Sequence, residues 1–272
     1  MSSDEFQLQN YLARIGYRGP LSPDLKTLSA LHAAQVHAIA FEALDSLLGR
    51  PVHVDLASVQ NKLIGGRRGG YCFEQNLILK TALEAIGFQV TGLSGRVRWR
   101  FAPEDPLGPR THMLLKIDLP EGCYLVDAGF GSCVLDAPLK LEAGIEQPTA
   151  MGTYRLNQAD GLYWLSAKQP AGWRTMYVFD LQPQLPSDYV LGNWYTSTHP
   201  SIPFTSMAVM ERLTGDRRYK LVNRRLVIEA RDGETVAERM IESAAELAQV
   251  IDEVFGVTLP APAEDVWART EG

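Results

Sequence analysis

The sequence predicts an α+β protein of three parts: an N-terminal helical domain, a middle part that forms an antiparallel barrel or curled sheet, and a mixed C-terminal part of strands and one helix. Three changes of pattern support this prediction. Apolar residues recur at helical spacing up to about residue 87, strand-like alternation replaces it from Gln89, and strand segments precede one last helix near the C-terminus. Because 272 residues is long for one compact core, we place domains at 1–87, 88–190 and 191–272.

Four helices are predicted in the first part. A short amphipathic helix at 6–15 ends at Gly16, and a second begins after Ser22, which we expect to be its cap. A third runs from Asp55 to the glycine pair at 65–66. The fourth covers 73–86, where apolar residues dominate, and Gly87 closes it.

The strands of the other two parts are separated by turn residues. In the barrel we expect strands within 90–99, a hairpin of 112–119 and 124–131, and strands at 154–156, 163–165 and 173–181. In the C-terminal part we expect strands at 207–213, 219–222, 226–230 and 235–240. Ser243 and Glu246 then form a capping box that opens the last helix.

Composition excludes several classes of protein. A net charge of −6 and a pI near 5.4 predict neither nucleic acid nor an anionic membrane as partner. The acidic start Met1–Glu5 is unlike a secretory signal, and no long apolar run predicts a membrane span, so we expect a cytoplasmic protein. The cysteines Cys72, Cys123 and Cys133 fit free thiols in a reducing compartment, without a disulfide framework or a metal site.

The stretch 67–76 holds the strongest candidate for chemistry. Gly69 and Gly70 free the backbone just before Cys72, which therefore lies at the start of the fourth helix. The unpaired N–H groups and the helix dipole favour an anion there, so a thiol in that place tends toward the nucleophilic thiolate. Cys72 is the predicted nucleophile, whereas Cys123 and Cys133 are read as structural.

A base for Cys72 must come from one of five histidines: His32, His37, His53, His112 and His199. His112 is the best placed, because it begins a strand whose hairpin partner carries Asp127. The residue opposite His112 would be near Gly129 or Phe130, two or three positions from Asp127, so the register or a bulge decides whether His112 and Asp127 meet. The order Cys, His, Asp is also that of papain-like enzymes. Spacing alone leaves a purely structural interpretation open, in which Cys72 is a buried apolar residue and Asp127 a turn former.

Four short motifs say more than spacing does. They are RRGGYCFEQN at 67–76, RTHMLL at 110–115, VDAGFG at 126–131 and NWYTSTHPSIPF at 193–204. Together, and in this order over most of the chain, they resemble the arylamine N-acetyltransferases. The resemblance implies a thiol acyltransferase fold of bundle, barrel and lid, and a catalytic triad of Cys72, His112 and Asp127.

The same resemblance implies a reaction and its ligands. An acetyl group would pass from acetyl-CoA to the enzyme as an acetyl-cysteine, and then to an arylamine, arylhydrazine or N-hydroxyarylamine, by a ping-pong mechanism without a metal. Tyr71, Phe130 and Phe204 would contact the acceptor. Gly129 and Gly131 would let the pantetheine and phosphates of coenzyme A approach the backbone.

One segment departs from the family pattern. Where the family usually carries a stretch like IPFENL, this chain has IAFEAL at 39–44, with Ala40 and Ala43 in place of the proline and the asparagine. We expect these positions to form the floor of the active site, so the departure bears on local rigidity and acceptor choice.

Other readings stay open. A protease or transglutaminase-like acyltransferase could use the same residue order on peptides, and a non-catalytic binding module could keep the fold with Cys72 inert. The sequence leaves the oligomeric state open, with a homo-oligomer among the options. The basic residues between Arg217 and Arg225 are read as turn and solvated surface charge, with phosphate binding as the weaker alternative.

Overall fold

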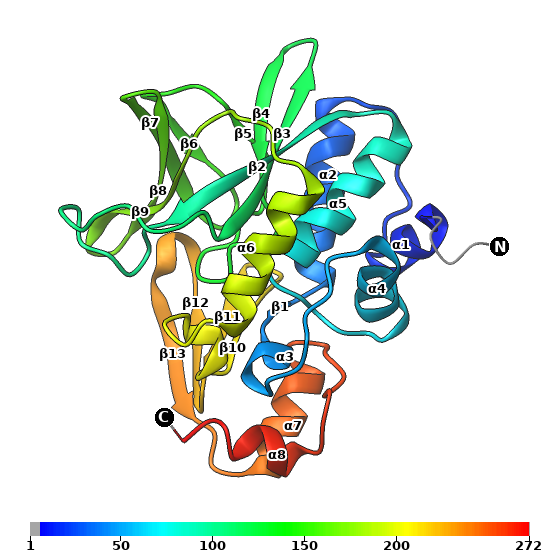
Figure 1. The fold of residues 1–272 in the computed structure, drawn as a ribbon, viewed down its shortest axis with the longest axis vertical. Coiled ribbons are helices and arrows are strands. Elements are labelled where there is room, and N and C mark those ends of the chain that lie inside the picture. Colours follow the sequence, from blue (N-terminus) through cyan, green and yellow to red (C-terminus); the bar gives the residue numbers. More distant parts are fainter. Residues whose placement is uncertain (1–5, 272) are drawn as a thin grey trace.

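The structure is a computed structural model that describes residues 6–271, so the prediction for Met1–Glu5 lies outside it. The expected α+β architecture is confirmed. A large sheet occupies the upper part of the molecule with the N-terminal helices beside it, and a smaller sheet lies below (Figure 1). Within the described residues, no helix has the length and apolar character needed to cross a membrane.

The four predicted N-terminal helices occur in the expected order, and the short helix α3 between the second and third was not predicted. The helices of this part are α1 (Leu8–Arg14), α2 (Leu25–Ala38), α3 (Leu44–Leu47), α4 (Leu56–Gln60), the π-helical turn η1 (Asn61–Gly65) and α5 (Cys72–Ile86). The predicted cap of α2 is wrong: the carboxylate of Asp24 accepts the N–H of Thr27 at 2.8 Å. Ser22 lies two residues too early for its hydroxyl to reach the free N–H groups of the helix. Gly87 ends α5 in the left-handed conformation, with φ of 106°, as expected.

Eight antiparallel strands form the predicted barrel. They are β2 (Gln89–Val97), β3 (His112–Leu119), β4 (Gly122–Val126), β5 (Leu139–Lys140), β6 (Glu146–Pro148), β7 (Thr153–Ala159), β8 (Leu162–Gln169) and β9 (Gly172–Phe179), in the order β5-β4-β3-β2-β9-β8-β7-β6. The side chain of Gln147 in β6 exchanges two hydrogen bonds with the backbone of Lys140 in β5. The two end strands therefore lie together, and the barrel is nearly closed.

The smaller sheet combines both ends of the chain. Its strands, in spatial order, are β1 (Phe41–Glu42), β10 (Val209–Thr214), β11 (Arg217–Val222), β12 (Arg225–Glu229) and β13 (Thr235–Met240). The helices α7 (Ala244–Glu253) and α8 (Ala263–Trp267) share one apolar core with this sheet. A short 3₁₀ turn, η2 (Pro203–Thr205), precedes β10, and a second one, η3 (Arg231–Gly233), lies between β12 and β13. Half of the expected capping box is present: Ser243 caps α7, but Glu246 accepts the N–H of Glu242. The domain boundaries at 87 and 190 stay predictions.

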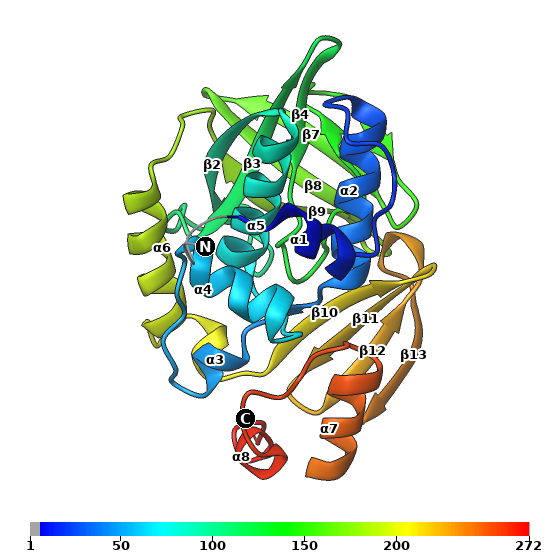
Figure 2. The same cartoon turned by 90° about the vertical axis from the view of Figure 1, so that its right-hand side faces the viewer.

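Helix α6 (Pro186–Thr198) is not predicted by the hydrophobic pattern. Figure 2 shows it at the outer edge of the molecule, beside the barrel. Its buried face is largely polar and consists of Tyr189, Asn193, Thr196 and Ser197. Apolar side chains such as Leu191 and Trp194 are exposed instead, so the usual amphipathic order is inverted.

The basic segment of β11 and β12 differs from its prediction at one position. Arg218 is 1% exposed, its Nε lies 3.2 Å from the Glu211 carboxylate, and it donates to the carbonyl of Val134 at 3.2 Å. Strand alternation turns this side chain into the interior, where a charge must be paired. Arg225 does follow the prediction, since it pairs with Glu238 at the surface.

The departure at 39–44 has a local explanation in the backbone. Ala43 is the N-cap of α3 and offers no acceptor, but the carboxylate of Glu42 accepts the N–H of Leu44 at 2.8 Å. The carbonyl of Ala40 accepts the N–H of Gly70 at 3.3 Å. Glu42 therefore satisfies the first N–H of α3, although Ala43 carries no capping side chain.

Candidate active site

Cys72 is the first residue of α5, as the glycine-rich stretch predicts. Tyr71 is the N-cap, and its N–H donates to the carboxylate of Glu74 at 3.1 Å, which fixes the entry of the chain into the helix. The thiol is 4% exposed and lies 3.6 Å from the carbonyl oxygen of Thr111, the residue before β3. The start of α5 therefore faces the start of β3.

His112 and Asp127 meet, which the sequence alone could not decide. The ladder of β3 and β4 ends at the pair Leu115–Val126, so Asp127 follows the last paired residue and is released from strict alternation. His112 Nε2 and Asp127 Oδ2 lie 2.7 Å apart, and both side chains are buried. This bond occupies Nε2 and leaves Nδ1 of His112 available, and the side chain of Cys72 interacts with the same imidazole.

In this buried site His112 and Asp127 each stabilise the charged form of the other. Burial opposes the charged imidazolium, but the carboxylate of Asp127 outweighs it and, with Cys72, raises the pKa of His112 to about 10. Burial alone would raise the pKa of Asp127, yet His112 and hydrogen bonds from Asn76 and Gly129 hold it below its usual range. An imidazolium on His112 facing the carboxylate of Asp127 is thus the favoured charge arrangement.

Asn76 is a member of this site that the sequence reasoning missed. It lies one helical turn after Cys72, and its Nδ2 donates to the carbonyl of Met113 at 2.7 Å and to Asp127 Oδ1 at 2.9 Å. Its Oδ1 accepts the N–H of Ala128 at 2.9 Å. The spacing of four residues from Cys72, which puts both side chains on one helix face, is the signal that could have identified it.

The other histidines do not replace His112. His32 is buried on α2, and its Nε2 lies 3.1 Å from the backbone carbonyl of Asp127. Burial lowers the pKa of His32, so it stays a neutral donor beneath the carboxylate residue. His199 stacks on Tyr195 at the surface, and His53 lines a cavity near Glu74.

The aromatic residues expected at the acceptor belong to two groups. Phe130 lies edge-on to His112, with ring centroids 5.3 Å apart. Tyr177 packs on the same imidazole at 4.6 Å, and the sequence reasoning did not single it out. Phe204, from the turn η2, packs against Tyr71 at 6.0 Å. The structure thus puts one group beside His112 and the other beside the residue that precedes Cys72.

The glycines of VDAGFG have a packing role. A Cβ on Gly129 would collide with the Cα of Cys72 and would lie 3.1 Å from Asn76 Nδ2. A Cβ on Gly131 would collide with the ring of Phe41. Glycine is therefore required for the close approach of this loop to α5 and to β1, whereas contact with coenzyme A stays a prediction.

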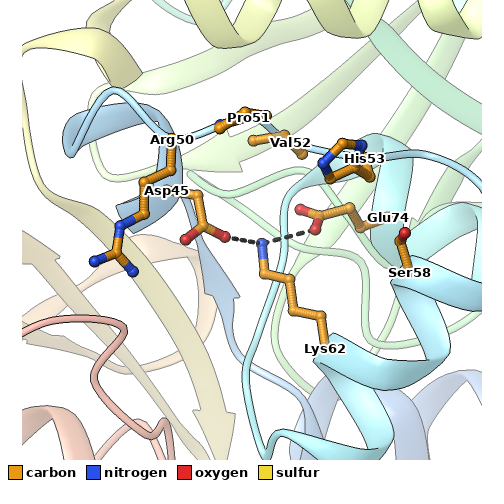
Figure 3. Close-up of a pocket in the computed structure, with 8 residues that line it drawn as sticks. All are labelled: Asp45, Arg50, Pro51, Val52, His53, Ser58, Lys62 and Glu74. Carbon is orange, nitrogen blue, oxygen red and sulfur yellow. Dashed lines mark hydrogen bonds and ion pairs between the residues drawn. The ribbon is translucent and has the colours of Figure 1, made fainter.

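Two small cavities are lined by residues close in sequence to Cys72 and His112. One, of about 200 Å³, lies behind the start of α5 and contains Lys62 between Asp45 and Glu74 (Figure 3). The other, of about 160 Å³, is lined by residues of β2 and β9 and by Arg110, which pairs with Asp180. Over residues 6–271, no group of three or more His, Cys, Asp or Glu side chains is arranged to hold a metal ion.

Known proteins are similar to this chain in fold and sequence. A family model described as N-acetyltransferase matches residues 24–264. The chain is 42% identical over 267 residues to an arylamine N-acetyltransferase of Mycolicibacterium smegmatis, with 96% of both chains covered. It is 36% identical to the arylamine N-acetyltransferase / N-hydroxyarylamine O-acetyltransferase of Salmonella typhimurium, over 92% of this chain and 88% of the relative. The solved structure of Mycobacterium marinum arylamine N-acetyltransferase in complex with CoA matches with a TM-score of 0.92 at 36% identity, over 97% of this chain and 98% of that chain.

Proposed function

The chain belongs to the arylamine N-acetyltransferase family, and we propose that Cys72, His112 and Asp127 perform its acetyl transfer from acetyl-CoA to an aromatic amine. The observation that carries this assignment is the buried His112–Asp127 bond of 2.7 Å beside a thiol at a helix start. This arrangement supplies a nucleophile, a base and a group that orients the base.

The first half of the reaction loads the enzyme. Cys72, as a thiolate paired with the imidazolium of His112, attacks the thioester carbonyl of acetyl-CoA. The first N–H groups of α5, which lack partners within the helix, lie near the oxygen that becomes negative. Collapse of the tetrahedral intermediate breaks the bond between the carbonyl carbon and the sulfur of coenzyme A and leaves the acetyl group on Cys72 as a thioester. Coenzyme A departs as a thiol, with its proton supplied by His112.

The second half passes the acetyl group on. The nitrogen of an arylamine or arylhydrazine, or the oxygen of an N-hydroxyarylamine, attacks the acetyl-cysteine while His112 takes up its proton. Cys72 then leaves as the thiolate that begins the next cycle. Asp127 stabilises the imidazolium in both halves because its carboxylate stays ionised and fixed by Asn76 and Gly129.

Aromatic side chains select the acceptor in this proposal. Phe130 presents its ring beside His112, and Phe204 presents its ring beside Tyr71, so a flat acceptor between the two groups would stack near both the thioester and the base. Gly129 and Gly131 keep the loop after Asp127 free of side chains, so the pantetheine of acetyl-CoA can follow the backbone.

The decisive experiment is mass spectrometry of the protein after rapid mixing with acetyl-CoA alone. We expect one added acetyl group on the peptide that contains Cys72, and none in Cys72→Ala. Absence of the adduct under rapid quench would overturn the covalent route.

A second measurement separates the acetyltransferase from the rival readings. Iodoacetamide should label Cys72 quickly at neutral pH, and acetyl-CoA should block the labelling. An unreactive Cys72 would support the non-catalytic binding module, whereas cleavage of peptide amides without turnover of acetyl-CoA would support the protease-like reading.

A further inference from the structure

A buried cluster of charges lies directly behind the start of α5. Lys62, on the turn η1, places its Nζ 2.7 Å from Asp45 Oδ2 and 2.7 Å from Glu74 Oε1. Figure 3 shows the ammonium group between the two carboxylates, on the wall of the 200 Å³ cavity. The side chain of Glu74 is only 2% exposed, so its charge depends on what it contacts.

Glu74 connects this cluster to the predicted nucleophile. One carboxylate oxygen contacts Lys62, and the other accepts the N–H of Tyr71 at 3.1 Å. Tyr71 immediately precedes Cys72. A Cβ on Gly70 would lie 2.8 Å from Glu74 Oε2, so the carboxylate packs tightly against the backbone before the helix. The position of Glu74 thus constrains the backbone on which Cys72 is mounted.

Glu74 depends on Lys62 more than the other carboxylates of the cluster do. Arg68 lies 2.7 Å from Glu42 and 3.1 Å from Asp45, so both keep a cation if Lys62 is removed. Within residues 6–271, Lys62 is the one cation that forms an ion pair with Glu74. Without it, Glu74 would be a buried carboxylate that no positive charge contacts, a state that proteins avoid by protonation.

We propose that Lys62 is a positioning residue for acetyl transfer, which keeps Glu74 ionised so that its carboxylate holds Tyr71 and, through the backbone, the thiol of Cys72 against His112. An ionised carboxylate is a stronger acceptor for a backbone N–H than a carboxylic acid, and it also matches the positive end of the helix dipole. The inference rests on the proposed role of Cys72.

Loss of Lys62 has a specific consequence for pH dependence. Burial already raises the pKa of Glu74, and Lys62 opposes this effect. In Lys62→Met the pKa of Glu74 therefore rises further. At the acid end of the working pH range the Glu74 carboxylate, which accepts the N–H of Tyr71, then becomes protonated and neutral. Because the ionised form is the active one, the activity of Lys62→Met should increase with pH where the wild type is level.

Other titratable and charged groups face Glu74 and could affect the same profile. They come from every neighbouring element and are Glu42 (β1), Asp45 (α3), Arg50 and His53 (cavity wall), Arg68 and Tyr71 (before α5) and Cys72 (α5). A second substitution, at Glu74 itself, distinguishes a pH effect of Glu74 from a pH effect of these neighbouring groups. A pH effect that arises in Glu74 disappears in Lys62→Met/Glu74→Gln, whereas one that arises in His53 or Cys72 persists.

The experiment measures kcat/KM for acetyl transfer from acetyl-CoA to an arylamine across the neutral and mildly acidic range. For Lys62→Met we expect a loss of about ten- to hundredfold at the acid end, with recovery as pH rises. Lys62→Arg should keep the wild-type profile because the cation remains. The matched control is Lys80→Met, which removes the exposed Lys80–Glu84 pair on the helix that carries Glu74 and should change nothing.

The comparison on a Glu74→Gln background remains decisive even if Lys62→Met does not fold. The neutral amide that Glu74→Gln introduces needs no cation, so adding Lys62→Met to this variant should change kcat/KM less than about threefold. A tenfold loss on that background, or a wild-type pH profile in folded Lys62→Met, would overturn the proposal. Failure of the underlying assignment looks different, because Cys72→Ala would then still transfer acetyl groups.

Discussion

The clearest test of the site's construction is the substitution Asn76→Ala. The side chain of Asn76 is fully buried and makes three hydrogen bonds, to Met113, Asp127 and Ala128. The truncation leaves the carbonyl of Met113 and the N–H of Ala128 unpaired in the interior. Each such group costs about 1 to 3 kcal/mol, so the free energy of unfolding should fall by about 2 to 6 kcal/mol.

Activity should fall as well, but not vanish. Asp127 keeps its bonds from His112 and from the N–H of Gly129, so the triad persists with a less firmly held carboxylate. Displacement of a catalytic group by about 1 Å can cost about a hundredfold, and we expect kcat/KM of Asn76→Ala to fall by up to that factor. Cys72→Ala, by contrast, should be inactive.

Urea unfolding monitored by fluorescence gives the stability change, and steady-state acetyl transfer gives the kinetic one. The matched control is Asn157→Ala, on the exposed face of β7, which should stay within about 0.5 kcal/mol of the wild type. If Asn76→Ala were as stable as Asn157→Ala, the three bonds would contribute nothing to stability and the reasoning would be refuted.

Two further predictions concern the same site. The folded protein raises the pKa of His112 to about 10, so the stability that this group contributes is fully present below its unfolded pKa of about 6.5 and is lost as pH rises through about 10. Urea titrations should therefore show that the wild type loses a few kcal/mol more than Asp127→Asn between about pH 6.5 and pH 10, and equal losses would contradict the ion pair. Gly129→Ala should destabilise the protein by about 1 to 3 kcal/mol and displace Cys72, with loss of acetyl transfer. Gly65→Ala is the control and should be tolerated, because a Cβ at this position meets no neighbouring atom. Thermal unfolding and activity assays check both variants.

Much of the fold was predictable because its signals are local. The glycine at position 87 and the capping residues Asp55 and Ser243 mark helix ends through bonds to residues at most a few positions away. Helix α6 was not predicted from the hydrophobic pattern, because tertiary contacts decide which of its faces is buried. Its buried face carries Asn193, whose Nδ2 donates to the carbonyl of Val52 at 2.8 Å, so polar residues occupy places where the pattern predicts apolar ones.

The sequence indicated the three residues of the proposed triad but not their geometry. The helix-start position of Cys72 follows from the preceding glycines, whereas the meeting of His112 and Asp127 depends on where the β3–β4 ladder ends. The burial of Arg218 could not be predicted either, because a one-residue difference in strand parity separates a solvated arginine from a buried one.

The start of α5 is held from several directions, so we expect the proposed active site to depend on residues that lie outside it. Gly70 forms backbone hydrogen bonds with the β1 segment, and the hydroxyl of Tyr71 donates a hydrogen bond to Asn193 of α6. Asn76 donates a hydrogen bond to the backbone of β3. Glu74 adds the link to Lys62. A helix start with fewer supports could still favour a thiolate electrostatically, but the thiol would sample positions away from His112. Substitutions at Asn193 or Lys62 should therefore act on acetyl transfer through the orientation of Cys72, even though neither side chain contacts the reacting atoms.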